Sequence, residues 1–126
     1  MQDKKHQIHE FDPKIYPRLV WVTVGAPYEV IKDMFEDVKP MDENADAQVD
    51  YTMRLKPNVK GGALIRFKDK AAMTTANITH EATHVAMTIL DYIGAEVDLK
   101  NQEYFSYLCG WIADCCQQVK SGKFKD

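Results

Sequence analysis

Two histidines four positions apart are the residues whose spacing most clearly indicates chemistry. The segment from His80 to His84 reads HEATH, which matches the pattern HExxH. On a helix, residues four apart project from one face, so both imidazoles can bind one Zn²⁺ at about 2.0 to 2.1 Å, with Glu81 beside the metal-bound water. The pattern predicts His80 and His84 as zinc ligands and Glu81 as the general base. A solvent-facing pair of histidines without metal is the alternative.

The helix expected to carry this motif spans about residues 73–93 and ends at Gly94. With about 100° of rotation per residue, its large apolar side chains fall on one broad arc. His80 and His84 fall on the opposite side of the same helix. The two histidines are therefore expected to face away from the core.

A catalytic zinc takes three protein ligands and keeps a fourth position open. A second helix is predicted over about 101–119, and its polar side carries Glu103, Tyr107 and Gly110. Eighteen residues lie between His84 and Glu103, enough for the end of one helix, a tight turn and an antiparallel return. We expect Glu103 to be the third ligand and Gly110 to allow a close approach of the helices. The alternative is an ordinary exposed glutamate, which the helix dipole favours in a first turn.

The elements that must position these helices lie earlier in the chain. A buried strand is predicted at 19–24, where the residues are mostly apolar and β-branched or aromatic, and a short amphipathic helix over about 27–37. Residues 36–50 carry six acidic side chains, which predicts a mobile loop. Two alternating segments, 51–56 and 63–68, predict a β-hairpin. We expect an α+β fold, with a small antiparallel sheet of about three strands packed on the motif helix and the glutamate helix.

Composition and charge predict one soluble domain. The 126 residues are 45% hydrophobic and 28% charged, which fits a single domain with flexible ends at 1–14 and 120–126. No apolar run is long enough for a membrane span or a signal peptide, and a net charge of -3 gives no attraction to nucleic acid. The three cysteines all lie in one late segment, which favours small core residues in a reducing compartment. We expect a cytoplasmic protein with no membrane or nucleic-acid partner, and no pattern indicates an oligomeric state.

An HExxH helix followed by a glutamate on the next helix resembles the gluzincin branch of zinc metallopeptidases. For so short a chain, the pattern is most similar to the minimal gluzincins and to the zincin-like proteins encoded by phages and bacteria. The resemblance covers about residues 62–119. It implies one Zn²⁺ per chain held by His80, His84 and Glu103, and hydrolysis of a peptide or protein by a zinc-bound water that Glu81 deprotonates. It also implies that an extended substrate lies along the strand at 63–68.

One position departs from that family and two other functions stay open. Tyr107 stands four residues after Glu103, where many gluzincins have an aspartate that orients a ligand histidine. Its phenol is expected either to accept that hydrogen bond or to act as the oxyanion donor. The alternatives to a peptidase are a zincin-like interaction protein without catalysis and a zinc hydrolase of a non-protein amide. The presence of Glu81 favours chemistry, because a purely structural site needs no base beside the metal.

Overall fold

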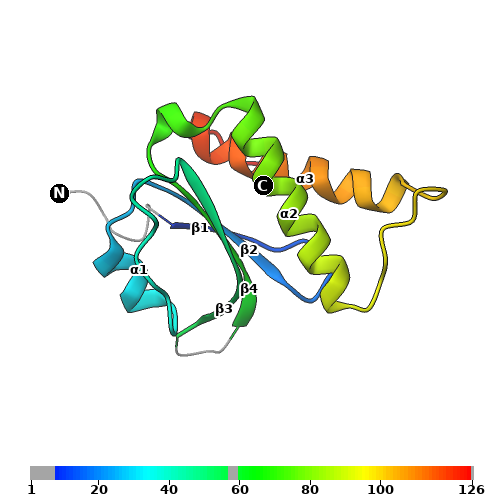
Figure 1. The fold of residues 1–126 in the computed structure, drawn as a ribbon, viewed down its shortest axis with the longest axis horizontal. Coiled ribbons are helices and arrows are strands. Elements are labelled where there is room, and N and C mark those ends of the chain that lie inside the picture. The colour runs from blue at the N-terminus through cyan, green and yellow to red at the C-terminus, as the bar shows by residue number, and fades with distance from the viewer. Residues whose placement is uncertain (1–7, 57–59, 126) are drawn as a thin grey trace.

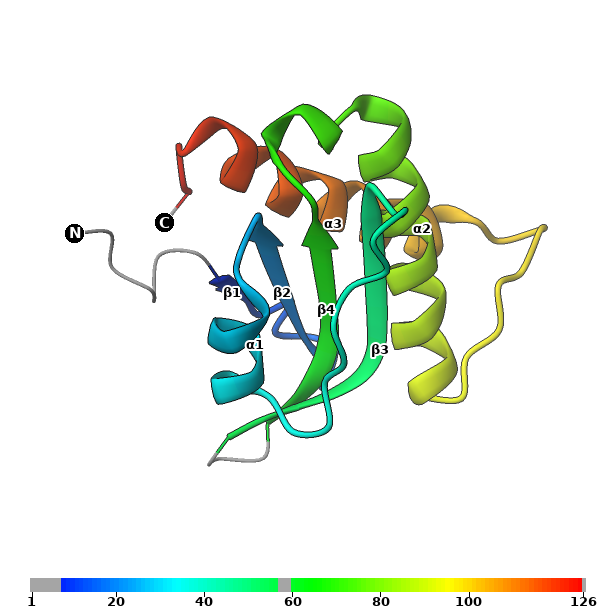
Figure 2. The same ribbon diagram turned by 60° about the vertical axis from the view of Figure 1, so that its left-hand side comes forward.

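The computed structural model describes residues 8–56 and 60–125, which form a sheet with helices on both faces (Figure 1). Its class is α+β, as predicted. Helices α2 and α3 cover one face of the sheet and α1 covers the other (Figure 2). The elements in chain order are β1 (Ile8–Phe11), β2 (Leu19–Val24), α1 (Tyr28–Met34), β3 (Ala47–Leu55), β4 (Lys60–Phe67), the 3-10 turn η2 (Lys70–Ala72), α2 (Thr75–Tyr92) and α3 (Glu103–Ser121).

The sheet is mixed and has four strands, in the order β1-β2-β4-β3. Strands β2 and β4 are parallel, whereas β1 pairs with β2 and β3 with β4 in antiparallel fashion. The prediction of about three antiparallel strands is wrong on both counts. The parallel pair arises because α1 and β3 lie between β2 and β4 in the chain, a connection long enough for a crossover.

Strands extend into parts of two segments that were predicted to be irregular. The predicted flexible end 1–14 is wrong for residues 8–11, which form β1, while residues 1–7 lie outside the described part of the chain. Phe124 packs its ring against His9 in β1, with centroids 4.9 Å apart. The predicted acidic loop is wrong for its last residues, because β3 already begins at Ala47.

The reason that an acidic segment joins the sheet is an ion pair across the strands. Arg66 of β4 is almost completely buried, and its Nε lies 2.8 Å from Oδ2 of Asp50 in β3. Arg66 also donates a hydrogen bond of 2.8 Å from Nη1 to the carbonyl oxygen of Lys39. The charge of Asp50 is therefore compensated inside the sheet, which the composition of the segment alone does not indicate.

Each side of the sheet supports a separate core. Strands β2 and β4 are buried on both faces, as their nearly continuous apolar sequences require. The core against α2 and α3 contains Val20, Val22, Ala63, Ile65 and Phe67 from the sheet, together with Ile78, Ala82, Val85, Ala86, Ile89, Leu90, Leu108, Ile112 and Cys116 from the helices. The core against α1 contains Trp21, Leu64, Ile31, Phe35 and Met53. No helix within residues 8–56 and 60–125 is long and apolar enough to cross a bilayer.

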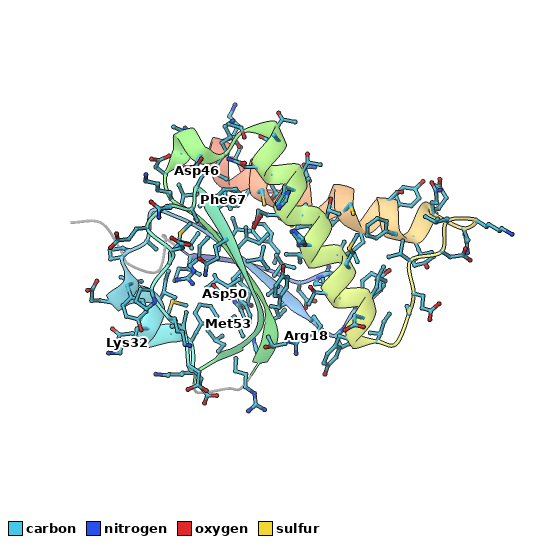
Figure 3. All side chains as sticks on the ribbon, viewed as in Figure 1. Arg18, Lys32, Asp46, Asp50, Met53 and Phe67 are labelled. Atoms are coloured by element: carbon cyan, nitrogen blue, oxygen red, sulfur yellow. The ribbon has the colours of Figure 1, made fainter. Side chains whose placement is uncertain are left out.

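A β-bulge in β3 moves that strand's side chains from one core to the other. The register passes from Asp50 opposite Leu64 to Met53 opposite Gly62, so two residues of β3 stand opposite one residue of β4. Before the bulge, Val49 packs against the α2 and α3 core, and after it Met53 packs against the α1 core. Figure 3 labels Asp50 and Met53, at the two sides of this bulge.

The two long helices confirm the predicted boundaries closely. The hydroxyl of Thr74 caps α2 by accepting a hydrogen bond of 3.1 Å from the amide of Asn77, and Gly94 follows the helix with a φ of 76°. Helix α3 ends at Gly122, whose φ is 74°. The predicted close approach at Gly110 is wrong, because a Cβ built there meets no atom within 4 Å.

A pair of glycine substitutions tests whether the β2–β4 pair requires the close backbone contact at Gly62. A Cβ at Gly62 would collide with the backbone carbonyl of Leu19 across the parallel β2–β4 pair, which cannot move aside. We expect Gly62→Ala to lower the free energy of unfolding by about 3 kcal/mol. The matched control, Gly110→Ala, lies in an open part of α3 and should raise that free energy by about 1 kcal/mol. Chemical denaturation measures both, and equal effects would contradict the proposed backbone contact.

Candidate metal centre

Helix α2 brings His80 and His84 together on its outer face. Their Nε2 atoms lie 3.2 Å apart, and their ring centroids are 4.7 Å apart. Both residues are exposed, and 66% of the His80 side chain is accessible to solvent. Two ligand atoms of a tetrahedral zinc at about 2.0 to 2.1 Å from the ion are about 3.3 Å apart. The separation of the two imidazole nitrogens therefore fits a shared Zn²⁺, and the predicted outward orientation of the pair is confirmed.

Glu81 lies beside this pair but points into the protein. Its side chain is only 9% exposed, and Oε1 lies 3.7 Å from Nε2 of His80. Burial raises the pKa of the Glu81 carboxyl above its ordinary value, while the positive charge that His80 and His84 can carry lowers it. A raised pKa makes a carboxyl group better suited to accept and return a proton. The motif places Glu81 between the histidines but does not reveal that it is buried.

Beneath Glu81 lies the helix crossing between α2 and α3. The charge of Glu81 adds to the effect of burial in raising the pKa of Cys116, and Thr83 lowers the pKa of Cys109, which burial raises. For both thiols, burial is the largest of the effects on the pKa. Cys115 and Cys116 are fully buried, which confirms the prediction that they are core residues. Glu81 thus stands where the motif helix meets the middle and later turns of α3.

The predicted third ligand, Glu103, is the first residue of α3 and is exposed. Figure 1 shows α3 beginning after a loop that extends away from the sheet, and then passing α2. Glu103 precedes Cys109 by six residues, which corresponds to about 9 Å along a helix. Within residues 8–56 and 60–125, no three His, Cys, Asp or Glu side chains form a group able to hold a metal ion. The structure brings His80, Glu81 and His84 together, and the role of Glu103 as third ligand stays a prediction.

Tyr107 faces a different part of the surface. It is 75% exposed and borders a largely apolar hollow between α3 and the segment before β2. The residues that line this hollow are Pro13, Ile15, Tyr16, Tyr104, Tyr107, Leu108 and Trp111. The motif residues are not part of that lining. The predicted roles of Tyr107, as partner of a ligand histidine or as oxyanion donor, therefore stay predictions.

The sheet edge next to the motif is β3. The expectation that an extended substrate lies along the strand at 63–68 is wrong, because β4 is paired with β2 on one side and with β3 on the other. The outer edge of the sheet on this side therefore belongs to β3, which packs against α2 (Figure 2). Tyr51 of β3 reaches His84, with ring centroids 6.3 Å apart and ring planes at 74°. Sequence reasoning missed Tyr51, because only the strand order shows which strand lies beside the histidines.

Comparison of the chain with protein-family models, with curated proteins and with solved structures gave no match. The resemblance to gluzincins therefore depends on the HExxH segment and on Glu103. Beyond this sequence pattern, the structure shows the spacing of the two imidazoles, the burial of Glu81 and the edge strand beside them. These features define the candidate metal centre as His80, Glu81 and His84, with Glu103 as the predicted fourth member.

Zinc binding tests the centre and its third ligand together. Calorimetric titration of untagged protein should give about one Zn²⁺ per chain, and His80→Ala combined with His84→Ala should abolish binding. If Glu103 is a ligand, Glu103→Gln should weaken the affinity at least tenfold, because an amide does not supply the carboxylate charge. Glu96→Gln, at another exposed glutamate before α3, is the control and should bind as the unmodified chain does. Equal affinities for both glutamine variants would remove Glu103 from the ligand set.

Thiol labelling tests the helix crossing beneath Glu81. Burial raises the pKa of both Cys115 and Cys116 to about 12, so at pH 8 both thiols stay protonated and unreactive in the folded chain. A chromogenic disulfide reagent should label at most one thiol per folded chain, and three after denaturation. The unfolded thiols ionise at their ordinary pKa near 9, so these groups lower the free energy of unfolding as pH rises from about 9 to 12. Rapid labelling of two thiols at pH 8 would contradict the packing.

Proposed function

We propose that the chain is a zinc-dependent peptidase of the gluzincin type with a zincin-like fold. The observation that carries the proposal is the close pair of imidazole nitrogens beside a buried carboxyl group. His80 and His84 present Nε2 atoms 3.2 Å apart, and the Glu81 carboxylate lies 3.7 Å from one of them. A pair of ordinary surface histidines has no need of a buried glutamate next to it, because burying a carboxyl group costs free energy.

Zn²⁺ would be held by His80, His84 and Glu103. When bound, the ion acidifies water and polarises the carbonyl group of the bond to be cleaved. The donor set of two imidazoles and one carboxylate is one that catalytic zinc sites use, and it leaves one position for water or substrate. Both histidines would bind the ion as neutral imidazoles.

Glu81 would act as the general base and then as the general acid. Its carboxylate removes a proton from the attacking water and delivers that proton to the amine that leaves. Its position supports both steps, because the side chain adjoins His80 and is otherwise enclosed by protein. Burial raises the tendency of this carboxyl group to hold a proton, which favours its transfer role over that of a simple counter-charge.

A peptide or protein substrate is favoured over a small amide by the sheet edge next to the histidines. The segment at the end of α1 already forms hydrogen bonds with the end of β3, at Arg54 and Lys56. The part of that edge before Met53 can pair with an extended chain through backbone hydrogen bonds. Tyr51, on that strand, already contacts His84, so a chain added to this edge would pass beside the motif. The three free thiols and the absence of a membrane-spanning helix from the described part are compatible with a cytoplasmic location, which we include in the proposal.

The test of this function is Glu81→Gln. The amide keeps the shape of the side chain but cannot accept the proton, so hydrolysis of fluorescently labelled casein by the zinc-loaded protein should fall at least about 100-fold. Zinc affinity should stay within twofold, because Glu81 is not a ligand. Glu96→Gln is the matched control and should retain full hydrolysis.

Two outcomes would overturn the proposal. Equal casein hydrolysis by Glu81→Gln and by the unmodified chain would remove Glu81 from catalysis. Tight zinc binding without zinc-dependent hydrolysis of casein or of short unfolded peptides would instead support an interaction protein that keeps the ion for structure.

A further inference from the structure

We infer that Tyr51 positions His84, and that its ring rather than its hydroxyl group does so. The ring packs against the His84 imidazole and restricts it to the orientation in which Nε2 faces His80. This role presupposes the zinc site of the proposed function, since it concerns how one ligand of that site is held. Strand β3 would thus contribute a positioning residue to the candidate metal centre, in addition to the residues of the HExxH segment.

The contact has the geometry of a favourable aromatic pair. The Tyr51 and His84 ring centroids are 6.3 Å apart and the planes are inclined at 74°, within the range of edge-to-face packing. His84 itself lies nearly perpendicular to His80, at 72°. An exposed histidine on a helix has several rotamers, and the ring beside it leaves fewer of them free. Tyr51 therefore lowers the entropy that His84 would lose on binding a metal.

The alternation of side chains along β3 explains why Tyr51 can reach the histidine. Ala47 and Val49 face the α2 and α3 core, and Tyr51 is two residues further in the same alternation. The bulge follows at once, because Tyr51 and Thr52 together stand opposite Ala63. Tyr51 thus keeps to the α2 side of the sheet while the rest of the strand changes sides.

Ligand histidines are usually oriented by a neighbour that contacts the part of the ring away from the metal. Such a neighbour is commonly a carboxylate or a carbonyl group that accepts a hydrogen bond. In this protein the contact with His84 comes from an aromatic ring on the edge strand, which is 43% exposed. Because the ring restricts His84 by packing, phenylalanine should replace tyrosine and smaller side chains should not.

The experiment compares zinc affinity, measured by competition with a chromophoric chelator at pH 7.5, in three variants. Tyr51→Phe should bind Zn²⁺ within twofold of the unmodified chain, whereas Tyr51→Ala and Tyr51→Leu should bind about three- to tenfold more weakly. Phe124→Ala is the matched control, since it removes an aromatic ring that packs on His9 outside the motif, and it should leave the affinity unchanged. Thermal unfolding of the metal-free proteins identifies any variant that has lost its fold. If Tyr51→Ala loses its fold, Tyr51→Leu still tests the proposal, because leucine retains apolar bulk at this position.

The outcomes separate this role from the proposed function. Unchanged affinity in both Tyr51→Ala and Tyr51→Leu would overturn the positioning role, and so would equal weakening in Tyr51→Phe, which would assign the effect to the hydroxyl group. The expected order of affinities without any casein hydrolysis would support Tyr51 and overturn the peptidase. An unmodified chain that binds no zinc would overturn both.

Discussion

The parallel pairing of β2 with β4 is the constraint on which the rest of the structure depends. Gly62 allows the two backbones to meet at Leu19, and the paired strands are then buried on both faces. Such a pair must be covered on each side. Helix α1 covers one face, and α2 and α3 cover the other. Because α2 lays its apolar stripe on this sheet, the opposite side of the helix is left to carry His80 and His84.

The strand pairing also determines what lies next to the histidines. With β4 in the interior, β3 becomes the edge beside α2, and its residue Tyr51 brings an aromatic ring to the histidine pair. The ion pair of Arg66 with Asp50 stands at the start of the same bulge and keeps an acidic segment within the sheet. A buried ion pair of this kind adds little net stability, but it disfavours registers in which either charge is left alone. The centre therefore combines a local helical motif with a neighbouring strand that only the tertiary structure supplies.

Local patterns predicted the helices, strand β2 and the β3–β4 hairpin well, but not the number, order and directions of the strands. The limits of α2 and α3 follow from Thr74, Gly94 and Gly122, all of which act on their immediate neighbours. The burial of Glu81, the parallel strands and the contact of Tyr51 depend on residues far apart in the sequence. Strand β1 has only four residues, which are too few for an alternation of apolar and polar side chains to distinguish a strand from a polar chain end. The HExxH spacing could be recognised from the chain, whereas its relation to α3 and β3 could not.

The contact between Phe124 and β1 has a consequence for the order in which this protein folds. Strand β1 has β2 as its partner on one side only, and Phe124, which packs on His9 and Phe11, comes from the segment after α3. Bringing residues so distant along the chain together carries a large loop-closure entropy. Contacts of such high sequence separation form slowly compared with those inside a helix. The pairing of β1 with β2 joins residues only 9 to 15 positions apart and should form earlier. The docking of Phe124 on β1 should thus form late and open early, so that the segment after α3 exchanges its amides with solvent faster than the two central strands do.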